Sequence, residues 1–146
     1  MPETIAIASD HGGLNLKAAL KEMLTEEGFG VLDLGPDSGE SVDYPDFGYA
    51  LAHAIKDGKA ARGVLICGSG IGISIAANRF PHVRAALVHD ALGARLSREH
   101  NNANVICFGE RTTGVDVAKD ALKVFLATEF EGGRHERRVD KLTNPS

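Results

Sequence analysis

Short apolar runs alternate with longer segments of helical periodicity along the chain. Apolar, β-branched runs predict five strands, at residues 4–9, 31–34, 63–67, 84–88 and 105–108. Apolar residues at helical spacing predict five helices, from residue 16 to a stop at Gly28, over 47–55, and at 71–78, 91–99 and 113–127. This alternation is typical of a parallel sheet covered by helices on both faces. We therefore expect an α/β domain with a five-stranded parallel sheet.

The length of 146 residues is that of one domain. Residues 1–130 carry the alternating pattern, whereas residues 131–146 form a basic tail without a core pattern. A formal net charge of -4 gives no general attraction to nucleic acid or to an anionic membrane. No long apolar span or signal peptide is visible, and two cysteines make no disulfide framework. We expect a cytoplasmic protein with neither nucleic acid nor membrane as a partner.

Cys67 opens the most informative segment, Cys-Gly-Ser-Gly-Ile-Gly, directly after a predicted buried strand. A strand-end cysteine often packs as a small hydrophobic residue. Three alternating glycines, however, would weaken a helix or strand, and they allow the backbone to approach a ligand closely. The helix that follows has a partial positive charge at its N-terminus, which favours a thiolate and bound anions. We interpret the segment as a site for a reactive sulfur.

Three better-known motifs do not match this segment. Ile73 stands where a dinucleotide-binding fingerprint needs its third glycine, and also where a cysteine phosphatase needs its arginine. No P-loop run occurs in the chain. The sequence therefore disfavours a nucleotide cofactor, nucleotide hydrolysis and a phosphoenzyme mechanism.

Ligands of open parallel sheets bind beyond the carboxyl ends of the strands, where the strand order reverses. This rule predicts that the loops after the first, third and fourth or fifth strands converge. We expect one crevice to receive Asp10 and His11, the Cys67 loop, and His100 with Asn101.

Several segments together resemble the type B ribose-5-phosphate isomerases over nearly the whole chain. They are residues 9–13 (SDHGG), 43–45 (DYP), 67–78 (CGSGIGISIAAN), 97–101 (SREHN) and 131–135 (EGGRH). The resemblance implies a Rossmann-like (flavodoxin-like) three-layer sandwich that needs no metal or organic cofactor. It also implies a homodimer, or a tetramer of two dimers, with active sites between subunits. The implied reaction interconverts ribose 5-phosphate and ribulose 5-phosphate in the pentose phosphate pathway.

The resemblance also assigns catalytic roles. Cys67 is the base that moves a proton between C2 and C1, and Ser69 relays a proton between the two oxygens. His100 opens the sugar ring with help from Asp10, which by its position alone could equally be a helix N-cap. Backbone N–H groups stabilise the enediolate, and they come from the segment 68–74, which includes Gly68, Gly70, Ile71, Gly72 and Ser74.

The remaining implied residues bind substrate. His11, Tyr44 and Asn101 contact the sugar phosphate, with His11 near the phosphate, although Tyr44 could equally be a half-buried aromatic residue. Arg134 and Arg138 are four residues apart, so on a helical turn both would face one phosphate. In this interpretation residues 131–146 complete the phosphate site, and Arg111 is a weaker candidate for the same role.

Cys107, within an apolar run, is expected to be an inert core residue. Three other histidines show no metal-ligand spacing, namely His53, His82 and His89.

Two alternatives stay open at this stage. Relatives that isomerise allose 6-phosphate or galactose 6-phosphate look similar to this chain, and one extra carbon changes binding by only about 1–3 kcal/mol. The second alternative is a non-catalytic phosphosugar-binding module. It would use the helix terminus and the arginines but would not need Cys67.

Overall fold

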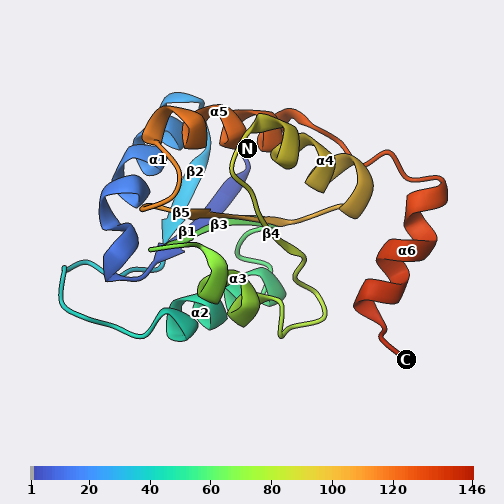
Figure 1. The fold of residues 1–146 in the computed structure, drawn as a ribbon, viewed down its shortest axis with the longest axis horizontal. Helices are drawn as coiled ribbons and strands as arrows, with labels where there is room; N and C mark the ends of the chain where they lie inside the picture. The colour runs from blue at the N-terminus through green and yellow to red at the C-terminus, as the bar shows by residue number, and fades with distance from the viewer. Residues whose placement is uncertain (1) are drawn as a thin grey trace.

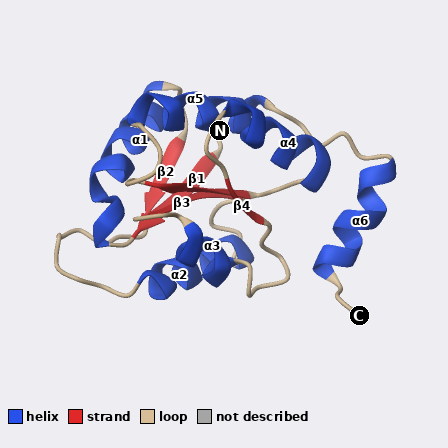
Figure 2. Cartoon of the chain, in the orientation of Figure 1, coloured by secondary structure: helices blue, strands red, loops and turns tan. Residues whose placement is uncertain are grey.

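Five parallel strands form the central sheet of the computed structural model, which describes residues 2–146 (Figures 1 and 2). The strands are β1 (Thr4–Ser9), β2 (Gly30–Asp33), β3 (Arg62–Cys67), β4 (Ala85–Leu87) and β5 (Val105–Gly109), in the order β2-β1-β3-β5-β4. The helices are α1 (Leu14–Glu26), α2 (Tyr44–Lys56), α3 (Ile71–Ala77), α4 (Ala91–Asn101), α5 (Val115–Ala127) and α6 (Arg134–Thr143). A 3-10 turn, η1 (His11–Gly13), joins β1 to α1.

Helices cover both faces of the sheet, so the molecule has three layers. Helices α1, α4 and α5 lie on one side and α2 and α3 on the other, as Figure 2 shows. The two cores follow the alternation of side chains along each strand. In β1, Ile5 and Ile7 are fully buried with side chains of α1, α4 and α5, whereas Ala6 and Ala8 pack with α2 and α3. The predicted three-layer fold with five parallel strands is confirmed.

The order of the last two strands decides which loops meet. A flavodoxin-like sheet has the order 2-1-3-4-5, but here β5 lies between β3 and β4. Cys67 at the end of β3 is therefore in register with Gly109 at the end of β5. The loop after β5, and not the loop after β4, lies beside the Cys67 loop.

Helix α4 carries the chain away from that edge of the sheet. Asp90 caps its start by accepting a hydrogen bond from the Gly93 N–H at 2.8 Å. An 11-residue helix is about 16 Å long, and α4 ends just before β5 begins. His100 and Asn101, in its last turn, therefore lie toward the amino ends of the strands. The prediction that they converge on the Cys67 crevice of the same chain is wrong.

The C-terminal tail forms α6, which packs mainly against α4 and projects from the sandwich at one end (Figure 1). His135 and Val139, four residues apart, are buried. The prediction that residues 131–146 lack a core pattern is wrong, because two inward positions suffice for a short helix docked on one neighbour. The helical spacing expected for Arg134 and Arg138 is confirmed.

No helix in residues 2–146 combines the length and the apolar character that crossing a membrane requires.

Candidate active site

A cleft of about 580 Å³ lies beyond the carboxyl ends of the strands, where the strand order reverses. The loops after β1, β3 and β5 and the starts of α2 and α3 line it. The lining residues are Asp10, Tyr44, Cys67, Gly68, Ser69, Ile71, Gly72, Ile75, Arg111 and Thr112. The convergence that the sequence predicted for the loops after the first and third strands is therefore present.

These loops are in close contact with one another. A Cβ atom on Gly12 would lie 3.4 Å from the Gly68 nitrogen, and one on Gly68 would lie 3.7 Å from Arg111 Cδ. Glu110 adds a longer connection, because its Oε1 accepts a hydrogen bond at 2.7 Å from the N–H of Leu16 in the first turn of α1. The loop after β5 is thus tied to the helix that follows β1.

Cys67 ends β3 at the base of the cleft. Its side chain is largely buried, with the residue only 4% exposed; it packs at the margin of one hydrophobic core and also lines the cleft. The Gly70 N–H donates a hydrogen bond to Sγ at 3.1 Å, which fixes the sulfur relative to the loop. Cys107, on the neighbouring strand, is completely buried. Burial chiefly, with a smaller contribution from Cys67, raises the pKa of the Cys107 thiol. Cys107 therefore stays neutral, as expected of a core residue.

Gly70 makes the sharp turn from β3 into α3. Its φ of 78° is in the left-handed region, and a Cβ atom there would lie 2.8 Å from the backbone carbon of Phe108. Because the turn is this tight, α3 begins immediately beside the sulfur. In an α-helix the first N–H groups have no acceptor within the helix. The amides of Gly72 and Ile73 are in this position at the start of α3.

Two serines of this segment hold local hydrogen bonds. Ser69 Oγ accepts from the Ile71 N–H at 3.1 Å, so its hydroxyl hydrogen is free to point elsewhere. Ser74 Oγ donates to the Ile71 carbonyl at 2.7 Å and does not line the cleft. Ser69 is thus placed to exchange a proton with a ligand. Ser74 lies within α3 and its N–H donates to the Gly70 carbonyl at 3.3 Å, so the prediction that its backbone amide faces the substrate is wrong.

Tyr44 lies against the glycine loop at the start of α2. A Cβ atom on Gly72 would come within 2.5 Å of its ring, so the ring packs directly on the glycine backbone. The ring is partly exposed and lines the cleft. Tyr44 is therefore a wall of the cleft and not a core aromatic residue.

Asp10 and His11 follow β1. Asp10 Oδ1 accepts from the Gly12 N–H at 2.8 Å, so the N-cap role is real. The same carboxylate is largely buried and lines the cleft. His11 is exposed, and its Nδ1 accepts from the Val42 N–H at 3.1 Å, which leaves Nε2 to carry a proton. Asp10 faces the cleft, whereas His11 is not among the residues that line it.

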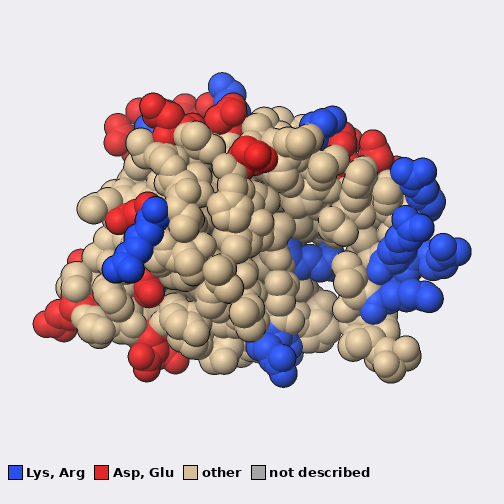
Figure 3. All heavy atoms as spheres, viewed as in Figure 1, with Lys and Arg blue, Asp and Glu red and all other residues tan. Residues whose placement is uncertain are grey.

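Four predicted site residues lie away from this cleft. Arg134 and Arg138 are exposed on α6, about 40° apart around the helix at 3.6 residues per turn. His100 stacks on His135 at the junction of α4 and α6, with ring centroids 4.5 Å apart. Asn101 lines a second hollow of about 370 Å³ beneath α6, together with Arg84. In Figure 3, basic side chains gather over α6, and another basic group lies in the hollow beside it.

The sequence did not single out two residues of the cleft, Ile75 and Thr112. Ile75 follows Ile71 by one helical turn, and both side chains are more than half exposed, at 59% and 53%. Two apolar residues on the outward side of a short predicted helix were the sequence signal that could have indicated a binding surface. Thr112, in the turn after β5, gave none.

Comparison with known proteins identifies the family of this chain. A family model described as Ribose/Galactose Isomerase matches residues 5–142. The chain belongs to the ribose/galactose isomerase family. Ribose-5-phosphate isomerase B of Escherichia coli is 43% identical, covering 95% of the chain and 93% of its own length. D-erythrulose-4-phosphate isomerase of Pectobacterium atrosepticum is 44% identical, covering 95% of the chain and 92% of its own length.

The solved structures give the same family. Ribose-5-phosphate isomerase B of Clostridium thermocellum is 51% identical, with a TM-score of 0.94 over 96% of this chain and 95% of the other. The expected kinship with the type B ribose-5-phosphate isomerases is confirmed. This ribose/galactose isomerase family member is an aldose-ketose isomerase, so the alternative of a non-catalytic module is not supported.

Proposed function

We propose that this isomerase interconverts ribose 5-phosphate and ribulose 5-phosphate through an enediolate, as a step of the pentose phosphate pathway. One observation carries the proposal. Cys67 Sγ ends β3 in the cleft, accepts a hydrogen bond from the Gly70 N–H, and adjoins the first turn of α3. A base and a row of amide donors are the two requirements for moving a proton beside a carbonyl group.

The reaction proceeds from the open-chain aldose. Cys67, as thiolate, removes the hydrogen on C2, and the electron pair moves onto the C1 oxygen to form the enediolate. The free amides at the start of α3 stabilise that negative charge, an interaction typically worth about 2.7–4 kcal/mol per donor. Ser69 transfers a proton between the two oxygens, and the Cys67 thiol returns its proton to C1. No atom is gained or lost over these steps, so no co-reactant is consumed.

Ring opening and phosphate binding require groups that one chain does not bring to its own cleft. Arg111 is the single cation that lines the cleft among residues 2–146. We assign the missing groups to a second copy, whose α4 and α6 present His100 and Asn101, with Arg134 and Arg138, to this cleft. The exposed apolar pair on α3, Ile71 and Ile75, gives that copy a surface to cover. The functional unit is then a homodimer, or a tetramer of two dimers.

In the assembled site, His100 opens the ring of ribose 5-phosphate. An imidazole, with an ordinary pKa of about 6.5, can both donate and accept a proton near neutral pH. Asp10, at the base of the cleft, assists from the other side. His11 and Tyr44 contact the substrate, and His11 lies toward the phosphate with the arginines.

The test replaces the sulfur and leaves the fold intact. In Cys67→Ala, kcat should fall about 10²- to 10⁴-fold, the usual contribution of a general base. Affinity for ribose 5-phosphate, measured by calorimetry, should change less than about tenfold, or 1.4 kcal/mol. Cys107→Ala is the matched control, because Cys107 packs in the same layer as Cys67 but does not line the cleft; it should keep its turnover number. Normal turnover in Cys67→Ala would refute the proposed base.

The Pectobacterium relative, a D-erythrulose-4-phosphate isomerase, supports a second candidate substrate, D-erythrulose 4-phosphate. Allose and galactose 6-phosphates are the other competitors, and pocket length discriminates between neighbouring sugars by only about 1–3 kcal/mol. Initial rates with all four sugar phosphates rank them. A higher kcat/KM for any other sugar would replace ribose 5-phosphate in the proposal. Both cysteines are free, which supports a reducing compartment, the cytoplasm.

A further inference from the structure

Three side chains that can bind metal ions converge where α4 meets α6. Glu131 Oε1 lies 3.5 Å from His135 Nε2 and 4.0 Å from His100 Nε2. All three ligand atoms lie within 4.8 Å of one another, and no other such group of three occurs in residues 2–146. Two histidines and one glutamate are a ligand set that zinc sites in proteins use.

The backbone holds these residues together before any ion arrives. The Glu131 N–H donates to the Glu99 carbonyl at 3.1 Å, which ties the segment before α6 to the last turn of α4. The His135 side chain is only 9% exposed, and its ring supports the ring of His100 in a stack with an interplanar angle of 16°. The backbone tether and the buried His135 ring therefore lose little conformational entropy when the ligands close on an ion.

We propose that His100, Glu131 and His135 bind a divalent transition-metal ion of the zinc type, and that the ion inhibits ring opening. The ligands of a tetrahedral zinc ion lie about 3.3 Å apart, since each bond is about 2.0–2.1 Å long. The cluster reaches this spacing by two small movements. The half-exposed carboxylate of Glu131 shifts inward, and the His100 ring rotates out of the stack, because an imidazole lone pair lies in the ring plane. Water takes the fourth position.

The inhibitory effect rests on the proposed function, in which His100 opens the ring. A metal ion on Nε2 occupies the lone pair that would accept a proton. Ribulose 5-phosphate needs no ring opening, because its free hydroxyl groups are too close to the C2 ketone to close a five-membered ring. At saturating ribose 5-phosphate the closed ring fills the site and turnover stops, whereas turnover of ribulose 5-phosphate continues. A metal ion on Cys67 would instead stop both directions.

The experiment measures binding and direction separately. The metal-free full-length enzyme is titrated with Zn²⁺ by calorimetry, and with Co²⁺ by visible absorption, in the absence of sugar. Buffered free Zn²⁺ is then added to assays in both directions. We expect kcat with ribose 5-phosphate to fall at least tenfold, and kcat with ribulose 5-phosphate to change less than twofold.

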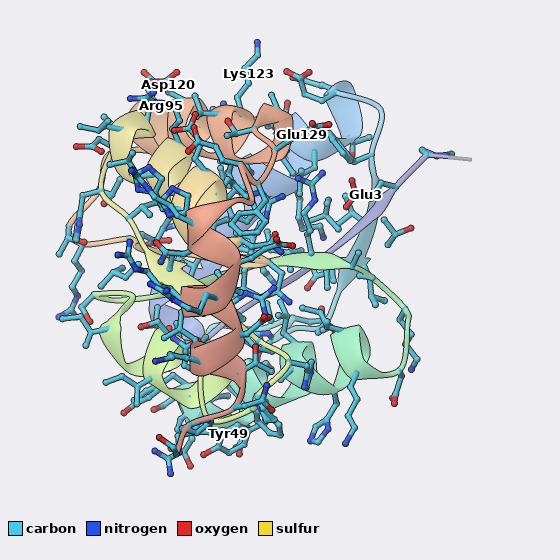
Figure 4. The ribbon with its side chains drawn as sticks, turned by 90° about the vertical axis from the view of Figure 1, so that its right-hand side faces the viewer. Glu3, Tyr49, Arg95, Asp120, Lys123 and Glu129 are labelled. Atoms are coloured by element: carbon cyan, nitrogen blue, oxygen red, sulfur yellow. The ribbon has the colours of Figure 1, made fainter. Side chains whose placement is uncertain are left out.

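Two variants remove ligands with little disturbance of packing. His135→Phe keeps a stacked ring, and Glu131→Gln keeps the side-chain shape. Each should weaken Zn²⁺ binding at least tenfold and relieve inhibition, with metal-free kcat within about threefold of the parent. Two matched controls should bind Zn²⁺ normally. They are Glu129→Gln, on the segment that joins α5 to α6 and labelled in Figure 4, and His53→Asn, an exposed histidine distant in sequence from the cluster.

Three results would overturn the proposal. They are unchanged Zn²⁺ affinity in both ligand variants, equal inhibition in the two directions, or loss of Zn²⁺ binding in Cys67→Ala. Failure of the proposed function looks different. The metal-free enzyme would then interconvert neither sugar phosphate, while the titrations without sugar would still decide whether the metal site exists.

Discussion

Replacing Gly70 with alanine tests the turn that places the sulfur beside α3. Gly58 offers a matched comparison, because its φ of 77° is nearly the same as the 78° of Gly70. A Cβ atom on Gly58 would meet nothing within 4 Å. On Gly70 it would lie 2.6 Å from Leu87 Cδ1 and 2.9 Å from the Phe108 carbonyl oxygen. The two variants therefore share one backbone cost and differ in one steric cost.

The size of each cost follows from these contacts. Alanine in the left-handed region costs about 1–2 kcal/mol, so Gly58→Ala should lose about that much stability. Overpacking adds about 1–3 kcal/mol, and Phe108 cannot yield easily because it lies in β5, between β3 and β4. Gly70→Ala should thus lose about 2–5 kcal/mol in all.

Urea unfolding measures both losses, at one fixed protein concentration because the stability of the proposed dimer would depend on concentration. Gly70→Ala should also lower kcat, because the displaced amide no longer holds Cys67 Sγ, whereas Gly58→Ala should keep it. Equal losses of stability in the two variants, within about 0.5 kcal/mol, would show that the turn is not sterically fixed by β5.

Three further changes probe the walls of the site and the charge network. Gly72→Ala should displace the partly exposed Tyr44 ring and raise KM with little loss of stability, and a double-mutant cycle with Tyr44→Ala should give less than additive effects on KM. In Asp33 burial acts to raise the pKa, but hydrogen bonds from two lysines and the Gly35 N–H outweigh it and lower the pKa. Asp33→Asn should lower the free energy of unfolding by about 2 kcal/mol at pH 7. Because the pKa of Asp33 is lower in the folded than in the unfolded protein, the parent loses this stabilisation as pH falls below about 4, and acid unfolding curves should show the two proteins approaching equal stability. Arg134→Ala should raise KM at least tenfold with kcat within about threefold, while Arg95→Ala, on the outer surface of α4, should change neither; unchanged KM in Arg134→Ala would remove that residue from the phosphate site.

Local sequence rules predicted most of the sheet, because the signal for each strand or helix lies within a few residues of sequence. The first strand was placed at its observed bounds, and the segment from Cys67 to the start of α3 was placed correctly. In each case the signal is an apolar run followed by glycines, and both features lie within a short stretch of sequence. Family resemblance then supplied chemical roles that the spacing of residues could not.

Strand order and the docking of α6 escaped prediction, since neither is a local property. Nothing near residues 84–88 or 105–108 says which run pairs with β3, although that choice brings Arg111 and Thr112 to the cleft. In α6 the inward residues are His135 and Val139, set among charges. A charged run of this kind is typical of a solvated surface, and only contact with α4 shows which side of the helix is buried.

The direction of the connections in a parallel sheet explains why His100 cannot serve the cleft of its own chain. Each crossover in a parallel sheet returns the chain from the carboxyl ends of the strands to the amino ends. The start of a helix therefore faces the crevice, as in α3, and the end of a helix lies at the opposite edge, as in α4. A histidine at the end of α4 can reach a crevice only if another copy presents one there. This topology supports the proposed shared site, and an active monomer seen by sedimentation would contradict it.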